Sequence, residues 1–458
     1  MVNCQRPRIQ LPNRPLSTGF ACALAVVLCS AVIRGENWPQ WRGPGGQGIS
    51  TETKLPAEWS PAKNVAWKVE VPGRGHSAPV VWNDRIYLTT AIEGDVVPGA
   101  KPAPHTNGGQ PFVHPDSVGA NRRHTYKVLA YDGKTGSLLW EQTAWQGTPY
   151  DDRHRRGSYA SPSVATDGRM IYAYFGSEGV YAYTVNGKPA WKTSIGRVKT
   201  LGLGAASSPV LYQDLVILQA DDDEGADSAI VALDARSGKE RWRTKRPVQV
   251  SWSTPVLVKA PSRTELVTNG TEWIIAYDPA SGTELWRSKG VDSNAIHTPV
   301  VGDGVVVVTA GFPVKKTIAI KPGGSGDITG TSNVLWTYEK GTAYVVSPIL
   351  YDGLVYLLND RGVMTAIDAK TGDIKYEGGR VPVPASFMGS PIAAKGQLLL
   401  TSEDGDTFVI KAGPRHEVLG TNSVGEPVYT TPAISNGRIY IRGDKHLFAI
   451  AATEPQRH

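Results

Sequence analysis

Cysteine is almost missing from this 458-residue chain: it occurs three times, at Cys4, Cys22 and Cys29. All three lie within or before the first apolar segment, so a chain that loses this segment contains none. Without cysteine, the remaining chain can form neither a disulfide nor a metal site with thiolate ligands. Its stability must therefore come from packing and hydrogen bonding.

Long apolar runs are equally scarce, and one short run stands out at residues 20–33, after three arginines. A basic stretch before an apolar segment too short to span a bilayer comfortably is typical of a secretory signal peptide. We predict a signal peptide over residues 1–35, cleaved near Ala31 or Gly35, and no transmembrane segment after its removal. The protein would be exported to the periplasm or the cell surface. Lipid anchoring at Cys29 is not expected, because the leucine before it is larger than lipidation signals prefer.

Excess charge is also missing from the mature chain. The formal net charge of +6 falls to +2 when Arg6, Arg8, Arg14 and Arg34 are removed with the signal peptide. A nearly neutral chain gives no reason to expect nucleic acid or an anionic membrane as a partner, and we expect a monomer. The Gly-x-Ser-x-Gly elbow and the His-Glu-x-x-His helix are absent, which excludes the commonest hydrolase and metalloprotease classes.

The chain does contain a repeat. Eight times a Ser, Thr or Ala precedes a proline that opens a short apolar run, at Pro79, Pro162, Pro209, Pro255, Pro299, Pro348, Pro391 and Pro432. After the first interval these prolines are 41 to 49 residues apart. Turn signals such as Asp352-Gly353 and Asn436-Gly437 then separate further β-rich runs. Four strands within such a period are typical of a β-propeller blade.

The two ends of the repeat define the boundaries of the domain. The first interval of 83 residues requires an insertion, which we place at 93–123 as a long loop within blade one. The last unit lacks a fourth strand, whereas residues 64–69 carry a closing tryptophan with no preceding unit. We therefore predict an all-β fold, an eight-bladed β-propeller over 64–451 that is closed by this N-terminal strand. An arm (36–63) precedes it and a tail (452–458) follows it.

Several units end in the pattern Ala-x-Asp-x-x-Thr/Ser-Gly-x-x-x-Trp, at residues 130–140, 232–242 and 276–286. This pattern resembles the repeat of the pyrroloquinoline-quinone (PQQ)-like propeller family. Residues 38–44, Trp-Pro-Gln-Trp-Arg-Gly-Pro, are also similar to the start of exported members of the family. The regular position of the tryptophans on the outer strand predicts that they dock neighbouring blades, each burying roughly 150 to 250 Å².

The resemblance implies two classes of function. Quinoprotein alcohol dehydrogenases share the eight-bladed fold, bind PQQ on the propeller axis with a calcium ion, and use an aspartate as base. Many of them also carry a disulfide between neighbouring cysteines, which this chain cannot form. No calcium-ligand set or base aspartate can be matched to a position here, so no catalytic residue is assigned. The propeller lipoprotein of the outer-membrane β-barrel assembly machinery is instead a scaffold that holds partner proteins through its loops.

The innermost strand of each blade lines the channel, so residues shortly before each repeat proline should surround the axial funnel. The aromatic members of this set form a hypothetical cofactor- or ligand-binding site, namely His76, Tyr159, Trp252, His297, Phe387 and Tyr429. Such rings could stack a planar ligand or a sugar ring. The alternative is that they only fill the narrow inner ends of the blades.

Two charged regions offer further candidate sites. The carboxylate-rich stretch 221–227 has hard oxygen ligands but lacks the alternating spacing of a calcium loop, so we expect a solvated turn. Residues 122–124 and 151–156 could together form a basic rim that contacts an anion. The alternative is that Asp151 and Asp152 partly neutralise the arginines in a surface loop.

The sequence therefore favours an exported PQQ-like propeller that acts as a non-catalytic binding or scaffold protein in the cell envelope. Its partner would be an envelope protein or an extracellular ligand, contacted through the insertion at 93–123. No cofactor and no metal site are assigned. The alternative is a PQQ- and calcium-dependent quinoprotein dehydrogenase that oxidises an alcohol or a sugar, with the planar cofactor near Trp252.

Overall fold

The computed structural model describes Met1, residues 36–292 and residues 294–452. The predicted signal peptide therefore lies, apart from Met1, outside the described residues, as does most of the predicted tail. All helices and strands fall within one compact unit, Gly35–His458. Within the described residues, no helix has the length and apolar character needed to cross a membrane.

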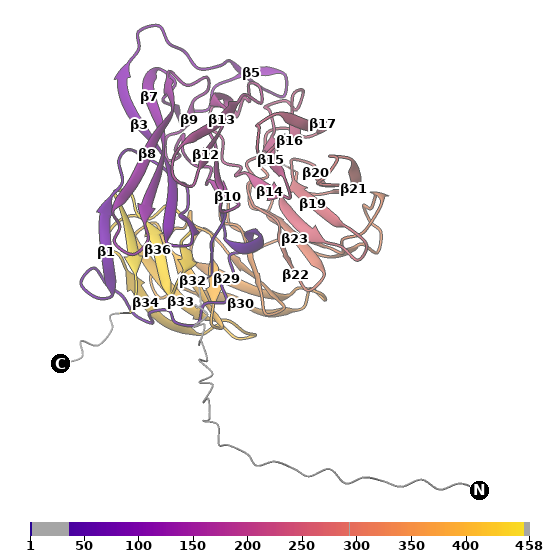
Figure 1. Ribbon diagram of the computed structural model, residues 1–458. Coiled ribbons are helices and arrows are strands. Elements are labelled where there is room, and N and C mark those ends of the chain that lie inside the picture. The colour runs from indigo at the N-terminus through magenta and orange to yellow at the C-terminus, as the bar shows by residue number, and fades with distance from the viewer. Residues whose placement is uncertain (2–35, 293, 453–458) are drawn as a thin grey trace, which may run out of the picture. The chain divides into compact units, whose positions relative to one another are not determined.

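Eight sheets follow one another along the chain and surround a common centre, as the colour ramp of Figure 1 shows. Each is an antiparallel meander of four strands, which confirms the predicted eight-bladed β-propeller. The strands of the first four blades, from the innermost outward, are β2 (Val80–Trp82), β3 (Arg85–Val96), β7 (Arg122–Asp132) and β8 (Leu138–Gly147); β10 (Ala165–Thr166), β11 (Met170–Tyr174), β12 (Val180–Thr184) and β13 (Pro189–Thr193); β14 (Val210–Tyr212), β15 (Leu215–Ala220), β16 (Ala229–Asp234) and β17 (Glu240–Lys245); β18 (Val256–Lys259), β19 (Thr264–Asn269), β20 (Trp273–Tyr277) and β21 (Glu284–Lys289).

The remaining four blades have the same order. Their strands are β22 (Val300–Gly302), β23 (Val305–Ala310), β24 (Lys316–Ile320) and β26 (Val334–Tyr338); β27 (Ile349–Tyr351), β28 (Leu354–Leu358), β29 (Val363–Asp368) and β30 (Ile374–Arg380); β31 (Ile392–Ala394), β32 (Gln397–Thr401), β33 (Asp406–Lys411) and β34 (Val418–Ser423); β35 (Ala433–Ser435), β36 (Arg438–Arg442), β37 (His446–Ile450) and β1 (Val65–Glu70). A short strand, β25 (Gly326–Asp327), adds to the outer edge of blade four in parallel to β21.

The ring is closed by the first strand of the chain. Strand β1 pairs antiparallel with β37, with Trp67 opposite Ala449 and Val69 opposite Leu447. The last blade therefore obtains its fourth strand from the N-terminal side, as the sequence predicts. Because β37 would otherwise present an unpaired edge, this pairing both completes the sheet and joins the two ends of the domain.

Five of the repeated tryptophans dock one blade onto the next by packing on the glycine of an Asn-Gly, Thr-Gly or Ser-Gly turn. The Trp140 indole donates from Nε1 to the carbonyl oxygen of Val185 at 3.1 Å. Its ring covers Gly187, where a Cβ atom would lie 2.7 Å from Trp140. The same contact recurs for Trp67, Trp191, Trp242 and Trp336 on the glycines Gly136, Gly238, Gly282 and Gly372. The turn therefore needs glycine for two reasons, a positive φ and the close approach of the ring.

Hydroxyl groups beside the repeat prolines connect the blades near the axis. In seven successive steps, a backbone N–H of one blade donates to a Ser or Thr hydroxyl of the next, as Thr254 does to Thr298 at 3.2 Å. The seven accepting residues are Ser163, Ser208, Thr254, Thr298, Ser347, Ser390 and Thr431. In blade one, Ala78 stands at the equivalent position and has no hydroxyl, so within the described chain the series ends at Thr431.

We expect Thr298→Val to lower the free energy of unfolding by about 1–3 kcal/mol, because it leaves the buried Thr254 N–H without this acceptor at nearly constant side-chain volume. Urea denaturation measures the change. The matched control is Thr264→Val on β19, whose hydroxyl makes no hydrogen bond in the described structure and whose loss should cost less than about 0.5 kcal/mol. Equal effects of the two substitutions would show that the hydroxyl series does not stabilise the ring.

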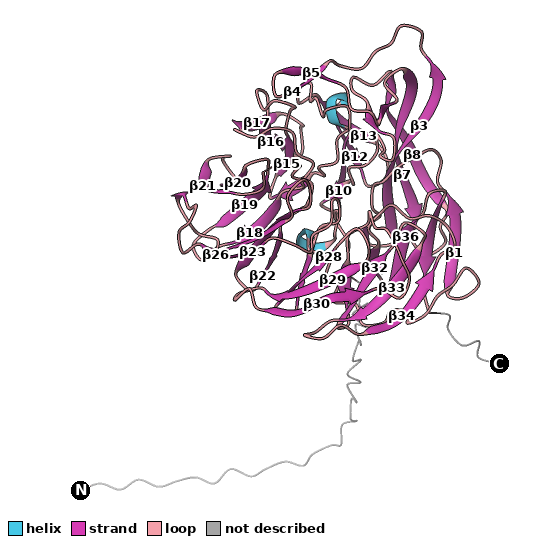
Figure 2. Cartoon of the chain, turned by 180° about the vertical axis from the view of Figure 1, so that it is seen from behind, coloured by secondary structure: helices cyan, strands magenta, loops and turns pink. Residues whose placement is uncertain are grey.

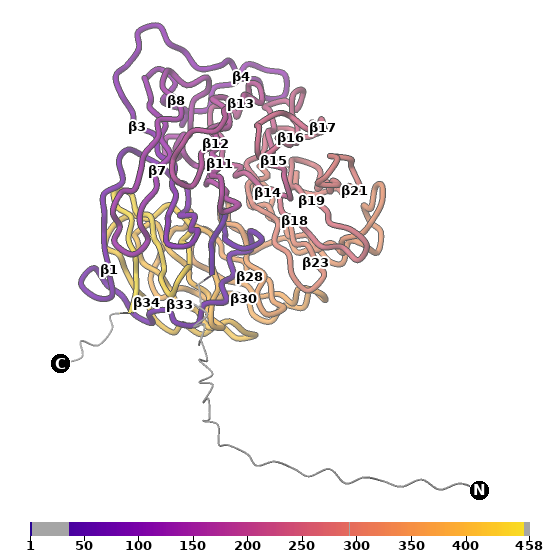
Figure 3. The backbone as a smooth tube through the Cα atoms, viewed as in Figure 1, coloured from indigo at the N-terminus to yellow at the C-terminus, as the bar shows by residue number. Residues whose placement is uncertain are grey.

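The arm before the propeller crosses the centre of the ring, where the indigo segment of Figures 1 and 3 contains the short 3-10 helix η1 (Pro44–Gly46). Trp38 forms a bridge with Val81 of blade one, and Ile49 bridges to Ala393 of blade seven. Between them, the buried Arg42 donates from Nη2 to the carbonyl oxygen of Pro348 at 2.7 Å. The segment 38–44, to which the sequence analysis attached no chemistry, therefore connects blade one with blade six.

The insertion of blade one lies between β3 and β7, where the sequence places it, but it is not simply a long loop. Within it, β4 (His105–Asn107) pairs with β5 (Gln110–Phe112), and β6 (Ser117–Val118) pairs with β9 (Arg153–His154) before blade two. These short pairings contain few alternating apolar residues, which is why the sequence pattern misses them. Figure 2 shows β4 and β5 beside the 3-10 helix η2 (Gly176–Glu178) of blade two.

Candidate functional site

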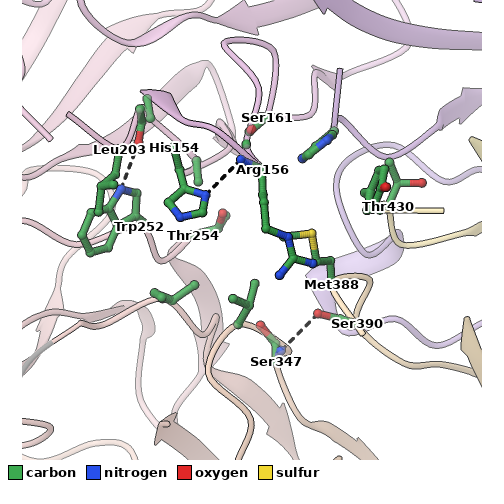
Figure 4. A pocket seen from close by; sticks show the side chains of 18 of the residues that line it. His154, Arg156, Ser161, Leu203, Trp252, Thr254, Ser347, Met388, Ser390 and Thr430 are labelled. Atoms are coloured by element: carbon green, nitrogen blue, oxygen red, sulfur yellow. Dashed lines mark hydrogen bonds between the residues drawn. The ribbon is translucent and has the colours of Figure 1, made fainter. Parts of the chain in front are cut away.

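A cavity of about 420 Å³ lies at the axis, surrounded by the segments that lead into the innermost strands (Figure 4). Its wall includes seven of the eight positions that stand three residues before a repeat proline. These are His76, Ala206, Trp252, Ile296, Val345, Met388 and Tyr429. The cavity is therefore built by the repeat itself, because the same position of successive blades faces the axis.

Three of the six aromatic residues predicted for the axial funnel lie in this wall: His76, Trp252 and Tyr429. The Trp252 indole is held by a hydrogen bond from Nε1 to the carbonyl oxygen of Gly204 at 2.9 Å. The His76 and Tyr429 rings lie side by side, with centroids 5.3 Å apart. The cavity thus has aromatic surfaces on two sides, and a binding role for these residues stays a prediction.

The other three predicted residues are packed behind the wall. Tyr159 donates its hydroxyl to the carbonyl oxygen of Asp151 at 3.0 Å and packs among the aromatic rings of blades one and two. His297 is buried and its Nδ1 lies 2.8 Å from the Thr309 hydroxyl. Phe387 belongs to the core between blades six and seven. The structure does not bring these three side chains together with the wall residues.

The environment of His76 makes it a neutral side chain. Burial, together with the positive charge of nearby arginines, lowers the pKa of His76 to about 3. Its Nε2 atom is buried and has no hydrogen-bond partner in the described structure. An unpaired polar atom at a cavity wall is a position where a bound ligand or water can make a hydrogen bond.

The wall residues that the sequence analysis did not name as site residues include Trp41 of the arm and His114 and Asp116 of the insertion. Trp41 belongs to the segment that resembles the start of exported family members, and that similarity was its only signal. The others were hidden because their loops reach the axis only through tertiary contacts. Arg156, which is also in the wall, lies within the charged stretch 151–156 that the sequence singled out.

His154, which also lines the wall, is oriented by its neighbours. The Arg156 backbone N–H donates to His154 Nδ1 at 3.1 Å, as the dashed line in Figure 4 shows, and His154 Nε2 lies 3.3 Å from Asp116 Oδ2. Burial lowers the pKa of His154. Both ring nitrogens are therefore engaged, so this imidazole is not a free general base facing the cavity.

Asp151 and Asp152 form no ion pair with the adjacent arginines in the described structure. Asp151 lies 2.8 Å from His105 of the insertion, and Asp152 accepts a hydrogen bond from the Ala120 backbone. The arginines pair with other segments: Arg153 with Glu93, Arg155 with Asp116, and Arg156 with Glu403. The chain folds the insertion over these residues, and that proximity is not encoded in their spacing.

The carboxylate-rich stretch is not the solvated turn that the sequence predicts. Asp221, Asp222 and Asp223 are all buried. Asp221 Oδ1 lies 2.8 Å from Nε of the buried Arg246, and Asp223 Oδ2 lies 2.8 Å from Nδ1 of His105. Buried carboxylates are stable only when they are paired, and the partners come from other segments of the chain.

The wall does not provide a calcium site of the kind that the dehydrogenase alternative requires. Calcium takes six to eight oxygen ligands, including carboxylates. Asp116 is the only carboxylate among the described wall residues, and it already faces His154 and Arg155. Elsewhere in the described chain, no cluster of three or more His, Cys, Asp or Glu side chains is placed to hold a metal ion.

Comparison with known families identifies the repeat. The family described as "Outer membrane protein assembly factor BamB" matches residues 124–255, 226–377 and 270–414, which together cover more than half of the chain. The chain belongs to this PQQ-like propeller family. A comparison with curated proteins found no match.

Solved structures of both functional classes of the family are similar in fold. BamB from Moraxella catarrhalis is 15% identical, with a TM-score of 0.52 over 81% of this chain and 99% of that protein. A quinohemoprotein alcohol dehydrogenase from Comamonas testosteroni is 12% identical, with a TM-score of 0.62 over 92% of this chain and 82% of that protein. A europium-containing methanol dehydrogenase is 12% identical, with a TM-score of 0.60 over 90% of this chain and 90% of that protein. At these identities the likeness concerns the fold.

Proposed function

We propose that the protein is an exported, non-catalytic binding or scaffold propeller of the cell envelope, and that it receives a ligand or a partner segment in the axial cavity. The observation that carries the proposal is the cavity itself. Its wall combines aromatic and aliphatic side chains with a few polar groups, which is the usual composition of a binding pocket. The His154 imidazole, one of the histidines in the wall, is fully hydrogen-bonded.

Exposed apolar side chains near the cavity support a protein partner. Tyr344 lines the cavity and is 40% exposed, and its ring lies 5.2 Å from that of Phe312, which is 53% exposed. On the insertion, Val113 is 84% exposed and directly precedes the wall residue His114. Apolar groups exposed around a pocket are typical of a surface that is covered by a partner.

Site-specific photo-crosslinking in cells tests this proposal. A photoreactive amino acid at Val113 or Phe312 should form crosslinks to an envelope protein, whereas the same group at Leu139 should not. Leu139 is the matched control, because it is 44% exposed but lies on the outer strand β8. Crosslinks formed only from Leu139 would show that the partner binds the side of the propeller rather than the mouth of the cavity.

The dehydrogenase alternative remains as a second candidate, because the aromatic cavity lies on the axis and two quinoprotein dehydrogenases share the fold. It is tested by titrating the purified mature protein with PQQ, with and without calcium, followed by a dye-linked alcohol oxidation assay. We expect no calcium-dependent turnover, since the wall offers only one carboxylate. Saturable, calcium-dependent binding with turnover would replace the binding-protein proposal.

A further inference from the structure

One side chain of the cavity wall pairs with a residue on a distant blade. Arg156 lies in the segment that enters blade two, and its Nη2 forms an ion pair with Oε2 of Glu403, between β32 and β33 of blade seven. Figure 4 shows the Arg156 side chain extending among the wall residues. The arginine side chain is 53% exposed and the glutamate 17% exposed, so solvent reaches this ion pair.

Two further arginines lie close to the wall residue His76 without lining the cavity themselves. Arg442 is fully buried and donates to Ser77 and to the Thr89 carbonyl oxygen, with no carboxylate within 4.0 Å in the described structure. Arg74 likewise forms no ion pair within the described residues, and its Nε atom is buried without a partner. Both arginines add positive charge at His76, where they help to lower the pKa.

Two other acids near the cavity are already paired with arginines, and a third, Asp444, lies close enough to Arg74 and Arg442 for its charge to offset part of the pKa lowering that burial causes in them. Asp116 lies 3.0 Å from Arg155, and Glu93 lies 3.3 Å from Arg153. Glu403 is the acid that forms an ion pair with Arg156. Because solvent reaches this ion pair, its net contribution to stability is small, and another carboxylate can replace Glu403 at little cost.

We infer that the axial cavity recognises a carboxylate group, which takes the place of Glu403 on Arg156 while the apolar part of the ligand packs against Trp252. This inference rests on the proposed function and names the chemistry of what the cavity binds. A small aromatic acid and an acidic side chain of a partner peptide present the same group. In either case Glu403 acts as an internal competitor.

Two matched probes test the inference: 2-naphthoate and 2-naphthamide, which have the same ring and differ in charge. Binding to the mature protein is followed by calorimetry. The carboxylate should bind about tenfold more tightly than the amide. In Arg156→Gln this preference should disappear while the amide affinity is retained. In Glu403→Gln the carboxylate should bind about two- to fivefold more tightly than in the wild type, because its competitor is gone.

A structural role of the ion pair predicts a different pattern, since both substitutions would then weaken both probes equally. That result would overturn the inference, as would equal affinities of the two probes for the wild-type protein. The second outcome would leave the proposed binding function intact, because the photo-crosslinks do not depend on the probes. Absence of binding of either probe, to the wild type and to Glu403→Gln alike, would also overturn it.

A third set of ligands distinguishes the two sources of the carboxylate. The N-acetylated, C-amidated peptides Asp-Trp-Asp and Asn-Trp-Asn are compared with the naphthalene probes under the same conditions. Tighter binding of the acidic peptide than of 2-naphthoate assigns the site to a partner segment, and the reverse order assigns it to a small molecule. In both cases the asparagine peptide should bind more weakly, and equal affinities of the two peptides would contradict the inference.

Discussion

Replacing Asp221 with asparagine is expected to lower the free energy of unfolding by about 3–5 kcal/mol. The side chains of Asp221 and Arg246 are both completely buried, with Oδ1 and Nε 2.8 Å apart. Asp221 also accepts hydrogen bonds from Ser251 and from Gln219. The substitution leaves the guanidinium buried without a counter-charge, and an unpaired buried cation is far more costly than the loss of a solvated ion pair.

Urea denaturation of the purified mature protein measures this effect. Asp227→Asn is the matched control, because it lies in the same loop but is exposed and should change the stability by less than about 0.5 kcal/mol. The double variant Asp221→Leu/Arg246→Met should recover most of the lost stability, since it removes both charges together. A double variant as unstable as Asp221→Asn would show that packing rather than charge is responsible.

His105→Asn is expected to destabilise the protein by roughly 3 kcal/mol at pH 7 and much less above pH 10. His105 is 8% exposed and its ring lies between two carboxylates, with Nε2 2.8 Å from Asp151 and Nδ1 2.8 Å from Asp223. Burial alone would lower the pKa of His105, but these two partners raise it to about 9. The imidazolium joins the insertion of blade one to the loops of blades two and three.

The sign of the pH dependence follows from the raised pKa. The stabilisation by His105 is fully present below the ordinary histidine pKa of about 6.5 and is lost as the pH rises through about 9. The measurement is the difference in unfolding free energy between wild type and His105→Asn, followed from pH 6 to pH 10.5. His416→Asn, at a half-buried histidine of blade seven that forms no ion pair in the described structure, is the comparison variant. If the difference in unfolding free energy stays constant with pH, a charged His105 between Asp151 and Asp223 does not stabilise the protein.

The wall of the cavity could be predicted in part, because it follows the repeat. Three of the six proposed aromatic residues, His76, Trp252 and Tyr429, face the cavity from one shared position of the blade. Tyr159 has the same position but packs behind the wall. His297 and Phe387 stand one residue away from that position and point into the core instead. In an extended chain, adjacent side chains point to opposite sides, so a shift of one residue exchanges the cavity for the core.

Charged contacts between distant segments were not predictable from the residues. The sequence shows that Asp221, Asp223 and Asp151 are acidic, but their partners Arg246 and His105 lie far away or in an insertion of irregular pattern. A local sequence pattern does not indicate which of two distant loops will lie against each other in the fold. The prediction that Asp221 and Asp223 are solvated was therefore wrong, because the fold places Arg246 and His105 beside them in the interior.

The sequence by itself determined the eight-bladed propeller, its closing strand at 65–70 and the docking role of the tryptophans, because each is repeated at a fixed period and each repeat makes the same local contacts. The tertiary structure alone decided three features: the path of the arm through the centre of the ring, the contacts of His105 with two carboxylates, and the ion pair of Arg156 with Glu403. These contacts occur once in the chain, between segments far apart in sequence, so no repetition could reveal them.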